Sequence, residues 1–320
     1  MSLNPRELQS SEPAGSSDSP VAHSEHSRDA ETRVAVPRVS VIMSVYDGNT
    51  LDEVAAAASS ILDQSFSAFE FLILNDGITR HELAEFLREL AAQDPRIQVI
   101  YSKDNRGIAR SLNTLIQLAR ADYVAVMDSD DLSAPERIGR QFTFLQDHPG
   151  VDIVGCFAIE IDARGNEIFE KRLPVDTDSM SRFMCYRDPL VHPSVMYRKT
   201  LFDRLSYYSE SPADAYFGDT DLWSRALLAG CGIANIPEPL YRFRRNESFL
   251  NRRRGWRFAL AELRLRMQYI RQAGLPKRYL LWPAMVAIMR VCPSPILRWA
   301  YRYCRGRCSP RARQSPRDFK

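Results

Sequence analysis

The sequence predicts an α/β fold in which helices flank a mainly parallel sheet. From residue 38 onward, short apolar runs rich in β-branched residues alternate four times with segments of helix length. Such alternation is typical of βα units that assemble into a parallel sheet. Turn-forming pairs such as Asp47-Gly48 bound the runs. With 320 residues and 45% hydrophobic content, the chain can form one large domain with an appendage.

The elements are expected in a regular order. We predict strands over Val39–Val45, Phe69–Leu74, Ile97–Tyr101 and Tyr123–Met127, and helices over Leu51–Leu62, about 80–92, about 108–119 and about 135–146. Pro135 suits the first turn of the last of these helices. Later segments predict a hairpin of Ile153–Ile161 with Ile168–Leu173, and a helix over about 220–228. Ligands of parallel sheets bind beyond the carboxyl ends of the strands, so those ends are the places to examine.

The two ends of the chain differ from this middle part. Residues 1–37 contain Ser, Glu, His and Pro without an apolar segment, which predicts disorder and gives no sign of a signal peptide. Residues 38–250 form the predicted α/β domain, and residues 251–320 a basic helical tail. Without an export signal, the six cysteines indicate reduced thiols in a cytoplasmic protein.

The tail carries a strong positive charge. Residues 242–320 hold 21 Lys and Arg against three acids, whereas the preceding part is acidic. Apolar residues step by four and three along one predicted helix, at Trp256, Leu260, Leu263, Met267 and Ile270. The next apolar segment, 279–291, is too short to span a bilayer. The tail therefore suits a membrane interface, with a helical cap packed on the domain as the alternative. Nucleic-acid binding is not expected, since no recognised nucleic-acid fold accompanies the charge.

Three acids follow the fourth predicted strand. Asp128, Asp130 and Asp131 lie within four residues, and a helix-capping loop would account for only one of them. Carboxylates concentrated at one point suit Mg²⁺ or Mn²⁺ held together with substrate phosphates. We therefore expect a divalent metal site here.

Other polar residues follow strands or begin a helix. Asp76 ends the second strand, where it either forms an Asn-Asp-Gly turn or accepts hydrogen bonds from a nucleoside. Tyr46 either stacks on a base or is a half-buried aromatic residue. Asp219 either caps the helix over about 220–228 or acts as a general base, with Asp221 as the rival candidate.

With these residues in view, the chain resembles a family 2 glycosyltransferase of the GT-A fold. The resemblance extends from about Val39 to Ser248. It rests on six segments in order: VSVIMSVYDG, SSILDQSFSAFEFLILNDG, NRGIARSLNTLIQLARADYVAVMDSDDLSAPERIGRQ, HPSVMYRK, GDTDLWSRAL and LYRFRRNES. No Gly-x-Gly-x-x-Gly follows the first strand, which argues against the usual dinucleotide fold.

The resemblance implies a role for each matching residue. Nucleoside contacts fall on Ser44, Tyr46 and Asp76. Asp128 falls where the family contacts ribose or metal, Asp130 where it holds the metal, and Asp219 on the catalytic base. Similar enzymes invert the anomeric centre in one displacement, while the metal-bound diphosphate leaves.

The chain departs from the family pattern at two places. Gly218 stands where a Glu commonly precedes the base, and no His follows the tyrosine-arginine motif. Arg244 or Arg245 either binds the diphosphate there or belongs to a solvated basic run. His192 either lies at the acceptor side or forms hydrogen bonds within a buried turn.

The expected function is transfer of a sugar from a nucleotide-sugar donor, most simply a UDP-sugar, to a glycan or lipid-linked acceptor in bacterial surface-polysaccharide assembly. The enzyme would be cytoplasmic and peripheral on the inner face of the cell membrane. The alternative is a degenerate nucleotide-sugar-binding or scaffold protein. A nucleotidyltransferase would need a basic triphosphate loop after the first strand, and the sequence has none there.

Overall fold

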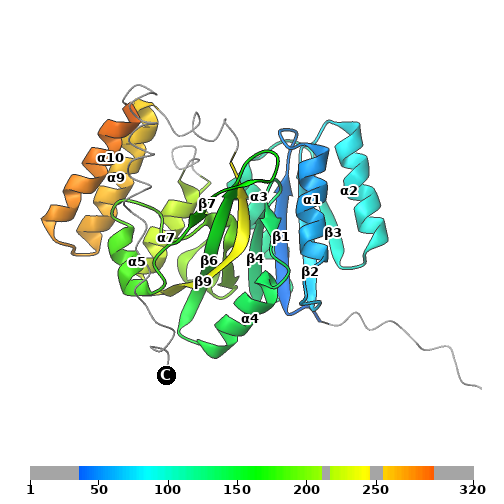
Figure 1. Cartoon of the computed structure of the whole chain (residues 1–320), viewed down its shortest axis with the longest axis horizontal. Coiled ribbons are helices and arrows are strands. Elements are labelled where there is room, and N and C mark those ends of the chain that lie inside the picture. Colours follow the sequence, from blue (N-terminus) through cyan, green and yellow to red (C-terminus); the bar gives the residue numbers. More distant parts are fainter. Residues whose placement is uncertain (1–35, 211–216, 246–254, 292–320) are drawn as a thin grey trace, which may run out of the picture. The chain divides into compact units, whose positions relative to one another are not determined.

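The computed structural model describes residues 36–210, 217–245 and 255–291. Within these residues, a nine-stranded sheet has the order β3-β2-β1-β4-β8-β6-β9-β5, and β7 pairs with β6 outside this order. Helices pack against the sheet, which confirms the predicted α/β architecture (Figure 1). The predicted disorder of residues 1–37 falls almost wholly outside the described residues.

The first half of the sheet is parallel, as the alternation of strands and helices predicts. Its strands are β1 (Val39–Val45), β2 (Phe69–Asp76), β3 (Ile97–Ser102) and β4 (Tyr123–Asp128). The connecting helices are α1 (Leu51–Leu62), α2 (His81–Gln93) and α3 (Ile108–Leu118). All three strand pairs, β1–β2, β1–β4 and β2–β3, are parallel.

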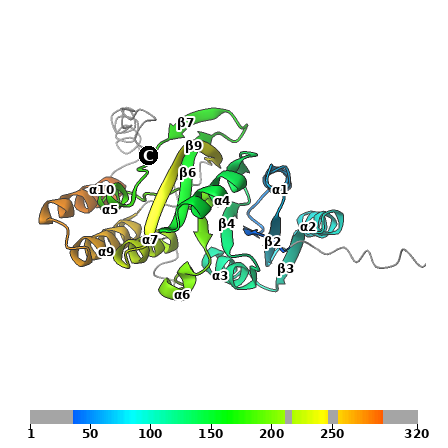
Figure 2. The same cartoon turned by 90° about the horizontal axis from the view of Figure 1, so that it is seen from below.

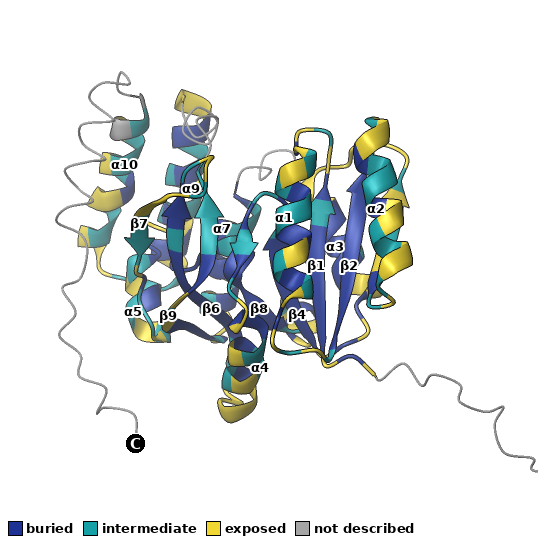
Figure 3. Cartoon of the chain, turned by 45° about the vertical axis from the view of Figure 1, so that its right-hand side comes forward, coloured by how far each residue is buried: buried dark blue, intermediate teal, exposed yellow. Residues whose placement is uncertain are grey.

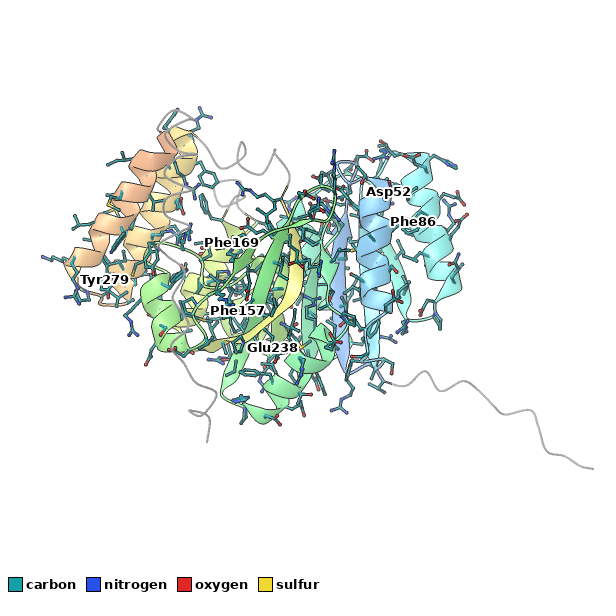
Figure 4. All side chains as sticks on the ribbon, viewed as in Figure 1. Asp52, Phe86, Phe157, Phe169, Glu238 and Tyr279 are labelled. Atoms are coloured by element: carbon teal, nitrogen blue, oxygen red, sulfur yellow. The ribbon has the colours of Figure 1, made fainter. Side chains whose placement is uncertain are left out.

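The sheet is buried on both faces because alternate residues of each strand point to opposite sides. Val41 and Met43 belong to the core beneath α1 and α2, whereas Ile42 belongs to the core on the side of α3. Figure 2 shows α1 and α3 on opposite sides of the strands. Phe86 of α2, labelled in Figure 4, packs against the first of these cores.

The second half of the sheet is mixed. It contains β5 (Leu132–Ser133), β6 (Val151–Ile161), β7 (Glu167–Lys171), β8 (Met196–Arg198) and β9 (Gly232–Arg244). Its helices are α4 (Arg137–Asp147), α5 (Thr177–Phe183), the 3-10 turn η1 (His192–Ser194), α6 (Leu201–Leu205) and α7 (Gly218–Leu228). The predicted hairpin is confirmed as β6–β7. Pro135 precedes α4, which begins two residues later than the sequence predicts.

Two helices follow the sheet. They are α9 (Trp256–Gln272) and α10 (Leu281–Val291), joined through the 3-10 turn η2 (Lys277–Leu280). Tyr269 and Ile270 of α9 are buried in the core on the side of α3 and α7. The predicted apolar stripe is only partly buried, since Trp256 is 62% exposed and Ile270 alone of its five residues is fully buried. Among the described residues, no helix combines the length and apolar content needed to cross a bilayer.

Candidate active site

The acidic loop lies at the carboxyl end of β4. Asp128 is the last residue of this strand, and the Asp131 N–H donates to the Asp128 carbonyl oxygen at 3.4 Å. Carboxylate oxygens of Asp128, Asp130 and Asp131 lie within 4.8 Å of one another. No other set of three His, Cys, Asp or Glu side chains converges in this way in the part of the chain that the structure describes.

Asp131 is the buried member of this cluster. Its side chain is 1% exposed, and its Oδ1 atom accepts a hydrogen bond from the Arg244 N–H at 2.6 Å. Its Oδ2 atom is buried and has no hydrogen-bond partner among the described residues. Burial raises the pKa of Asp131 well above its usual range, and the charges of Asp128 and Asp130 raise it further. A divalent cation would offset this repulsion and occupy the unpaired oxygen, so the residues present fit a metal.

Strand β9 holds the acidic loop in place. Its Arg242 pairs with Leu132 of β5, directly after the loop. The Tyr241 hydroxyl accepts a hydrogen bond from the Asp128 N–H at 3.3 Å. The Arg244 Nε atom donates to the Asp130 carbonyl oxygen at 2.8 Å. Main-chain and side-chain contacts from one distant strand therefore fix the loop.

The predicted solvated basic run is not what the structure shows at Arg244 and Arg245. The Arg244 guanidinium also donates to the carbonyl oxygens of Asp162 and Ala163. The Arg245 guanidinium lies 3.7 Å from the Glu160 carboxylate. Both side chains have protein partners, and that of Arg244 braces the backbone of the acidic loop.

The residues expected to contact the nucleoside lie at neighbouring strand ends. Ser44 of β1 pairs in register with Asp128 of β4. Tyr46 is 40% exposed, and its ring lies so close to Gly48 that a Cβ atom there would be 2.3 Å from a ring carbon. The β1 turn therefore presents an accessible aromatic ring near the acidic loop.

Asp76 joins β2 to the start of α3. Its two carboxylate oxygens accept hydrogen bonds from the N–H groups of Arg106 and Gly107, at 2.8 and 3.0 Å. Asp76 therefore has a structural role at this edge of the sheet, in addition to the nucleoside contact that the resemblance implies. Each oxygen keeps a second lone pair for a further donor.

Asp219 lies in the first turn of α7. The helix begins at Gly218, and its N-cap residue Phe217 makes no side-chain capping bond, so the interpretation of Asp219 as the N-cap is wrong. The Thr220 N–H donates to Asp219 Oδ1 at 2.8 Å. The rival candidate Asp221 forms an ion pair with Arg225 at 2.8 Å. That pairing gives Asp221 a structural partner of its own.

His192 belongs to a buried aromatic cluster. Its Nε2 atom lies 2.9 Å from the Tyr208 hydroxyl, which in turn lies 2.5 Å from the Tyr197 hydroxyl. Burial lowers the pKa of His192, and the charges of Asp219 and Asp188 oppose this effect. The hydrogen bond of the half-buried His192 side chain thus reaches Tyr208, outside its own turn.

The pKa of Tyr208 responds to the charges of both the acidic loop and Asp219. Burial raises this pKa, the hydrogen bond with Tyr197 lowers it, and the charges of Asp219 and Asp128 raise it again. Tyr208 and Asp188 have no signal in the sequence, because neither belongs to a local acidic or strand-end pattern. Asp131 is recognisable only as part of the acidic run.

A separate hollow of about 250 Å³ lies at the hairpin β6–β7. Its lining is Ile159, Glu167, Ile168, Phe169, Glu170 and Pro239, and Phe169 is labelled in Figure 4. None of the predicted site residues lines it. The candidate active site is therefore defined by the carboxylates at the strand ends.

Comparisons with known proteins identify the family of the chain. The family model described as Glycosyl transferase family 2 matches residues 40–205. The amylovoran biosynthesis glycosyltransferase AmsE of Erwinia amylovora is 28% identical over 82% of this chain and 97% of the relative. The putative glycosyltransferase EpsE of Bacillus subtilis (strain 168) is 30% identical over 82% of this chain and 92% of the relative. The Escherichia coli UDP-Gal:alpha-D-GlcNAc-diphosphoundecaprenol beta-1,3-galactosyltransferase is 25% identical over 73% of this chain and 84% of the relative.

Solved structures share the fold. S. aureus TarS 1-349 in complex with UDP-GlcNAc aligns with a TM-score of 0.56 at 19% identity, covering 76% of this chain and 69% of TarS 1-349. The mannosyltransferase PcManGT from Pyrobaculum calidifontis, in complex with GDP-Man and Mn²⁺, aligns with a TM-score of 0.57 at 17% identity, covering 84% of this chain and 79% of PcManGT. These likenesses confirm the predicted GT-A fold.

Proposed function

The chain belongs to glycosyl transferase family 2 and is a glycosyltransferase, and from this premise we propose that it transfers a sugar with inversion from a nucleoside diphosphate to an acceptor hydroxyl. One observation carries the proposal: carboxylate oxygens of Asp128, Asp130 and Asp131 converge at the carboxyl end of β4, and the charges of Asp128 and of Asp219 on α7 both raise the pKa of the buried Tyr208 hydroxyl. This convergence supports a single reaction centre. It also disfavours the alternative of a degenerate scaffold protein.

Asp219 is the proposed general base. Its carboxylate accepts the proton of the acceptor hydroxyl as the hydroxyl oxygen attacks the anomeric carbon of the donor. The bond from that carbon to the diphosphate oxygen breaks, and its electron pair leaves with the diphosphate. The Thr220 N–H, which donates to Asp219 Oδ1, orients the carboxylate for this step.

The donor is proposed to bind at the ends of β1, β2 and β4. Ser44, Tyr46, Asp76 and Asp128 would contact the nucleoside there. Support for a nucleotide-sugar comes from TarS, whose structure holds UDP-GlcNAc, and from PcManGT, whose structure holds GDP-Man. A relative named for a UDP-Gal donor favours UDP.

Asp128 and Asp130 are the proposed ligands of Mn²⁺ or Mg²⁺, with the unpaired Asp131 oxygen beside them. When bound, the cation would neutralise the charge that develops on the departing diphosphate. PcManGT supports this assignment, because its structure contains Mn²⁺. In this chain, Arg244 fixes the backbone of the ligand loop.

The acceptor is proposed to be a lipid-linked or surface glycan. One relative is named for amylovoran biosynthesis and another for a diphosphoundecaprenol-linked sugar. The exposed side of α10 supports attachment to a membrane, since the exposed residues Leu281, Met285 and Ile288 recur there at helical spacing. Exposed segments of α10 are yellow in Figure 3. Lys277 and Arg278 precede this face and are exposed. A cytoplasmic enzyme bound to the inner surface of the membrane follows from this proposal.

The test combines donor binding with turnover. A panel of sugar nucleotides, with and without Mn²⁺, is screened by thermal shift and by release of nucleoside diphosphate. Asp219→Asn should lower turnover by about 100-fold or more, because a general base contributes about that much, while donor-induced stabilisation persists. Asp130→Asn should remove the metal-dependent part of that stabilisation.

Asp203→Asn is the matched control, since Asp203 is an exposed acid in the first turn of α6. It should change neither binding nor turnover. Full turnover by the Asp219→Asn enzyme would show that another group accepts the proton.

A further inference from the structure

Arg266 of α9 is a buried charge beside the proposed active site. Its side chain is 2% exposed, and a buried guanidinium destabilises a fold unless it is paired. Its Nη2 atom lies 3.0 Å from Glu262 Oε1 and 3.1 Å from Asp188 Oδ1, and its Nη1 atom donates to the Met184 carbonyl oxygen at 2.8 Å. Although burial lowers the pKa of Arg266, the two carboxylates hold it above its usual value. The side chain therefore stays charged.

Asp188 connects this charge to the turn that carries Asp219. The same Asp188 Oδ1 atom accepts a hydrogen bond from the Thr220 hydroxyl at 2.9 Å. Thr220 is buried and directly follows Asp219. A polar chain thus runs from α9 through Asp188 to the first turn of α7.

The Thr220 hydroxyl has two acceptors within reach but only one hydrogen. Asp219 Oδ1 lies 3.4 Å from it, whereas Asp188 Oδ1 lies at 2.9 Å, so the hydrogen points to Asp188. Thr220 then donates only one hydrogen bond to Asp219 Oδ1, that of its backbone N–H. A carboxylate that accepts a further hydrogen bond in its charged form becomes a weaker proton acceptor.

We propose that Asp188 and Arg266 are positioning residues for Asp219: Arg266 fixes Asp188, and Asp188 draws the Thr220 hydroxyl away from the base. The inference rests on the proposed role of Asp219 as the general base. It gives helix α9 an indirect role in catalysis through Arg266. The polar chain also reaches α10, because Arg290 of α10 forms an ion pair with Glu262 of α9.

The test is a mutational cycle at Asp188 and Thr220 in the full-length enzyme. Asp188→Ala frees the Thr220 hydroxyl to turn to Asp219 and weaken it as a proton acceptor, so kcat should fall by about 10-fold, a part of the 100-fold or more that a general base contributes, while the donor KM stays unchanged. Asp188→Asn keeps an oxygen acceptor and should restore most of kcat. Adding Thr220→Val to Asp188→Ala removes the competing hydroxyl and should also raise kcat again, which a merely structural role would not produce.

Arg266→Lys is a second route to the same result. It keeps the charge but loses the guanidinium fork that reaches Glu262 and Asp188 together. Its kcat should fall less than that of Asp188→Ala and should also recover with Thr220→Val. Arg271→Gln, at an exposed position of α9, is the matched control and should leave kcat unchanged.

The outcomes separate this inference from the proposed function. If Asp219→Asn is inactive but Asp188→Ala has the wild-type kcat, the positioning role is wrong and the base assignment stands. The same holds if the double variant is no faster than Asp188→Ala. If Asp219→Asn is active, the proposed base is wrong, whatever Asp188 does. Donor-induced thermal stabilisation of each variant verifies that the donor site is folded.

Discussion

Asp131 and His192 are both enclosed titratable side chains, but their surroundings differ. Asp131 has two acidic neighbours and an unpaired oxygen, so its ionised form needs a cation. His192 lies between the rings of Tyr208 and Trp223 and forms a hydrogen bond to the Tyr208 hydroxyl. This enclosure favours the neutral imidazole. Asp131 is therefore suited to binding a cation, whereas the surroundings of His192 disfavour a charged imidazole.

His192 should make the fold sensitive to mild acid. Its pKa in the folded protein is lower than the value of about 6.5 expected in an unfolded chain. As the pH falls below about 6.5, the unfolded chain binds the proton first, so the free energy of unfolding decreases until the pH passes the folded pKa. Replacing His192 by Gln should flatten this dependence between pH 7 and 5, measured by urea unfolding.

His81→Gln is the control for this experiment, because the His81 side chain is 90% exposed. It should follow the wild-type pH dependence. An unchanged pH dependence in the His192→Gln protein would show that the imidazole is not kept neutral by the fold.

The sequence locates some site residues and not others for a physical reason. Asp76 and Asp128 could be selected because a strand leads directly to each of them. Asp219 could be selected only through its motif, and its role as a helix cap was wrong because α7 begins at Gly218, two residues earlier than predicted. Asp188 and Arg266 have no such local signal, since only the packing of α9 against the loop before η1 brings them together.

At the scale of elements, strands β1 to β4 could be predicted and β9 could not. The apolar β-branched runs of β1 and β2 are long enough to identify a buried strand. Strand β9 contains Pro237 and Pro239, which cannot donate to a strand ladder. Its pairing with β6 accommodates them through shifts of register around Phe157. Because the two prolines interrupt the apolar pattern, the sequence does not predict β9, the strand that covers the acidic loop.

Helix α9 was predicted, but part of its buried face was not. Hydrophobic spacing cannot show that Glu262 and Arg266 are buried, because they are stabilised by pairing with each other and with Asp188.

We propose that α9 belongs to the catalytic domain. Ile270→Ala should then lower the free energy of unfolding by about 2–5 kcal/mol, because it opens a cavity in the core, and the transition should remain a single step.

Ile288→Ala is the comparison for Ile270→Ala. Ile288 of α10 is 65% exposed, so its replacement should change stability little. Equal effects of the two substitutions, or a separate early transition for Ile270→Ala, would indicate that α9 folds apart from the sheet.

The whole molecule carries its charges unevenly. The last 79 residues, 242–320, hold 21 Lys and Arg with three acids, and the rest of the chain is acidic. In the described part of this region, α10 presents Leu281, Trp282, Met285 and Ile288 to the outside. Exposed apolar residues beside basic ones match an anionic lipid surface. The remaining tail residues, 292–320, lie outside the described residues.

Membrane attachment predicts salt-dependent binding to lipid. The full-length protein should float with vesicles that contain anionic lipid at low salt and should dissociate as salt rises, because each basic residue near the surface contributes about 1 kcal/mol. The double substitution Leu281→Glu with Ile288→Glu should abolish flotation without loss of turnover on a soluble acceptor.

Ile168→Glu is the matched control, since Ile168 is also exposed but lies on β7. It should leave flotation unchanged. Failure of the wild-type protein to bind anionic vesicles at low salt would refute attachment through the tail.

Strand β9 has a consequence for any attempt to transplant the acidic motif. Residues 40–205 include all three aspartates, yet Tyr241, Arg242 and Arg244 lie beyond them. A graft of the four-residue motif onto another scaffold would carry the proposed ligands without the strand that holds them, and water would solvate the Asp131 carboxylate, which is buried in this protein. Engineers who wish to retune cation preference should therefore randomise β9 and leave the aspartates as they are.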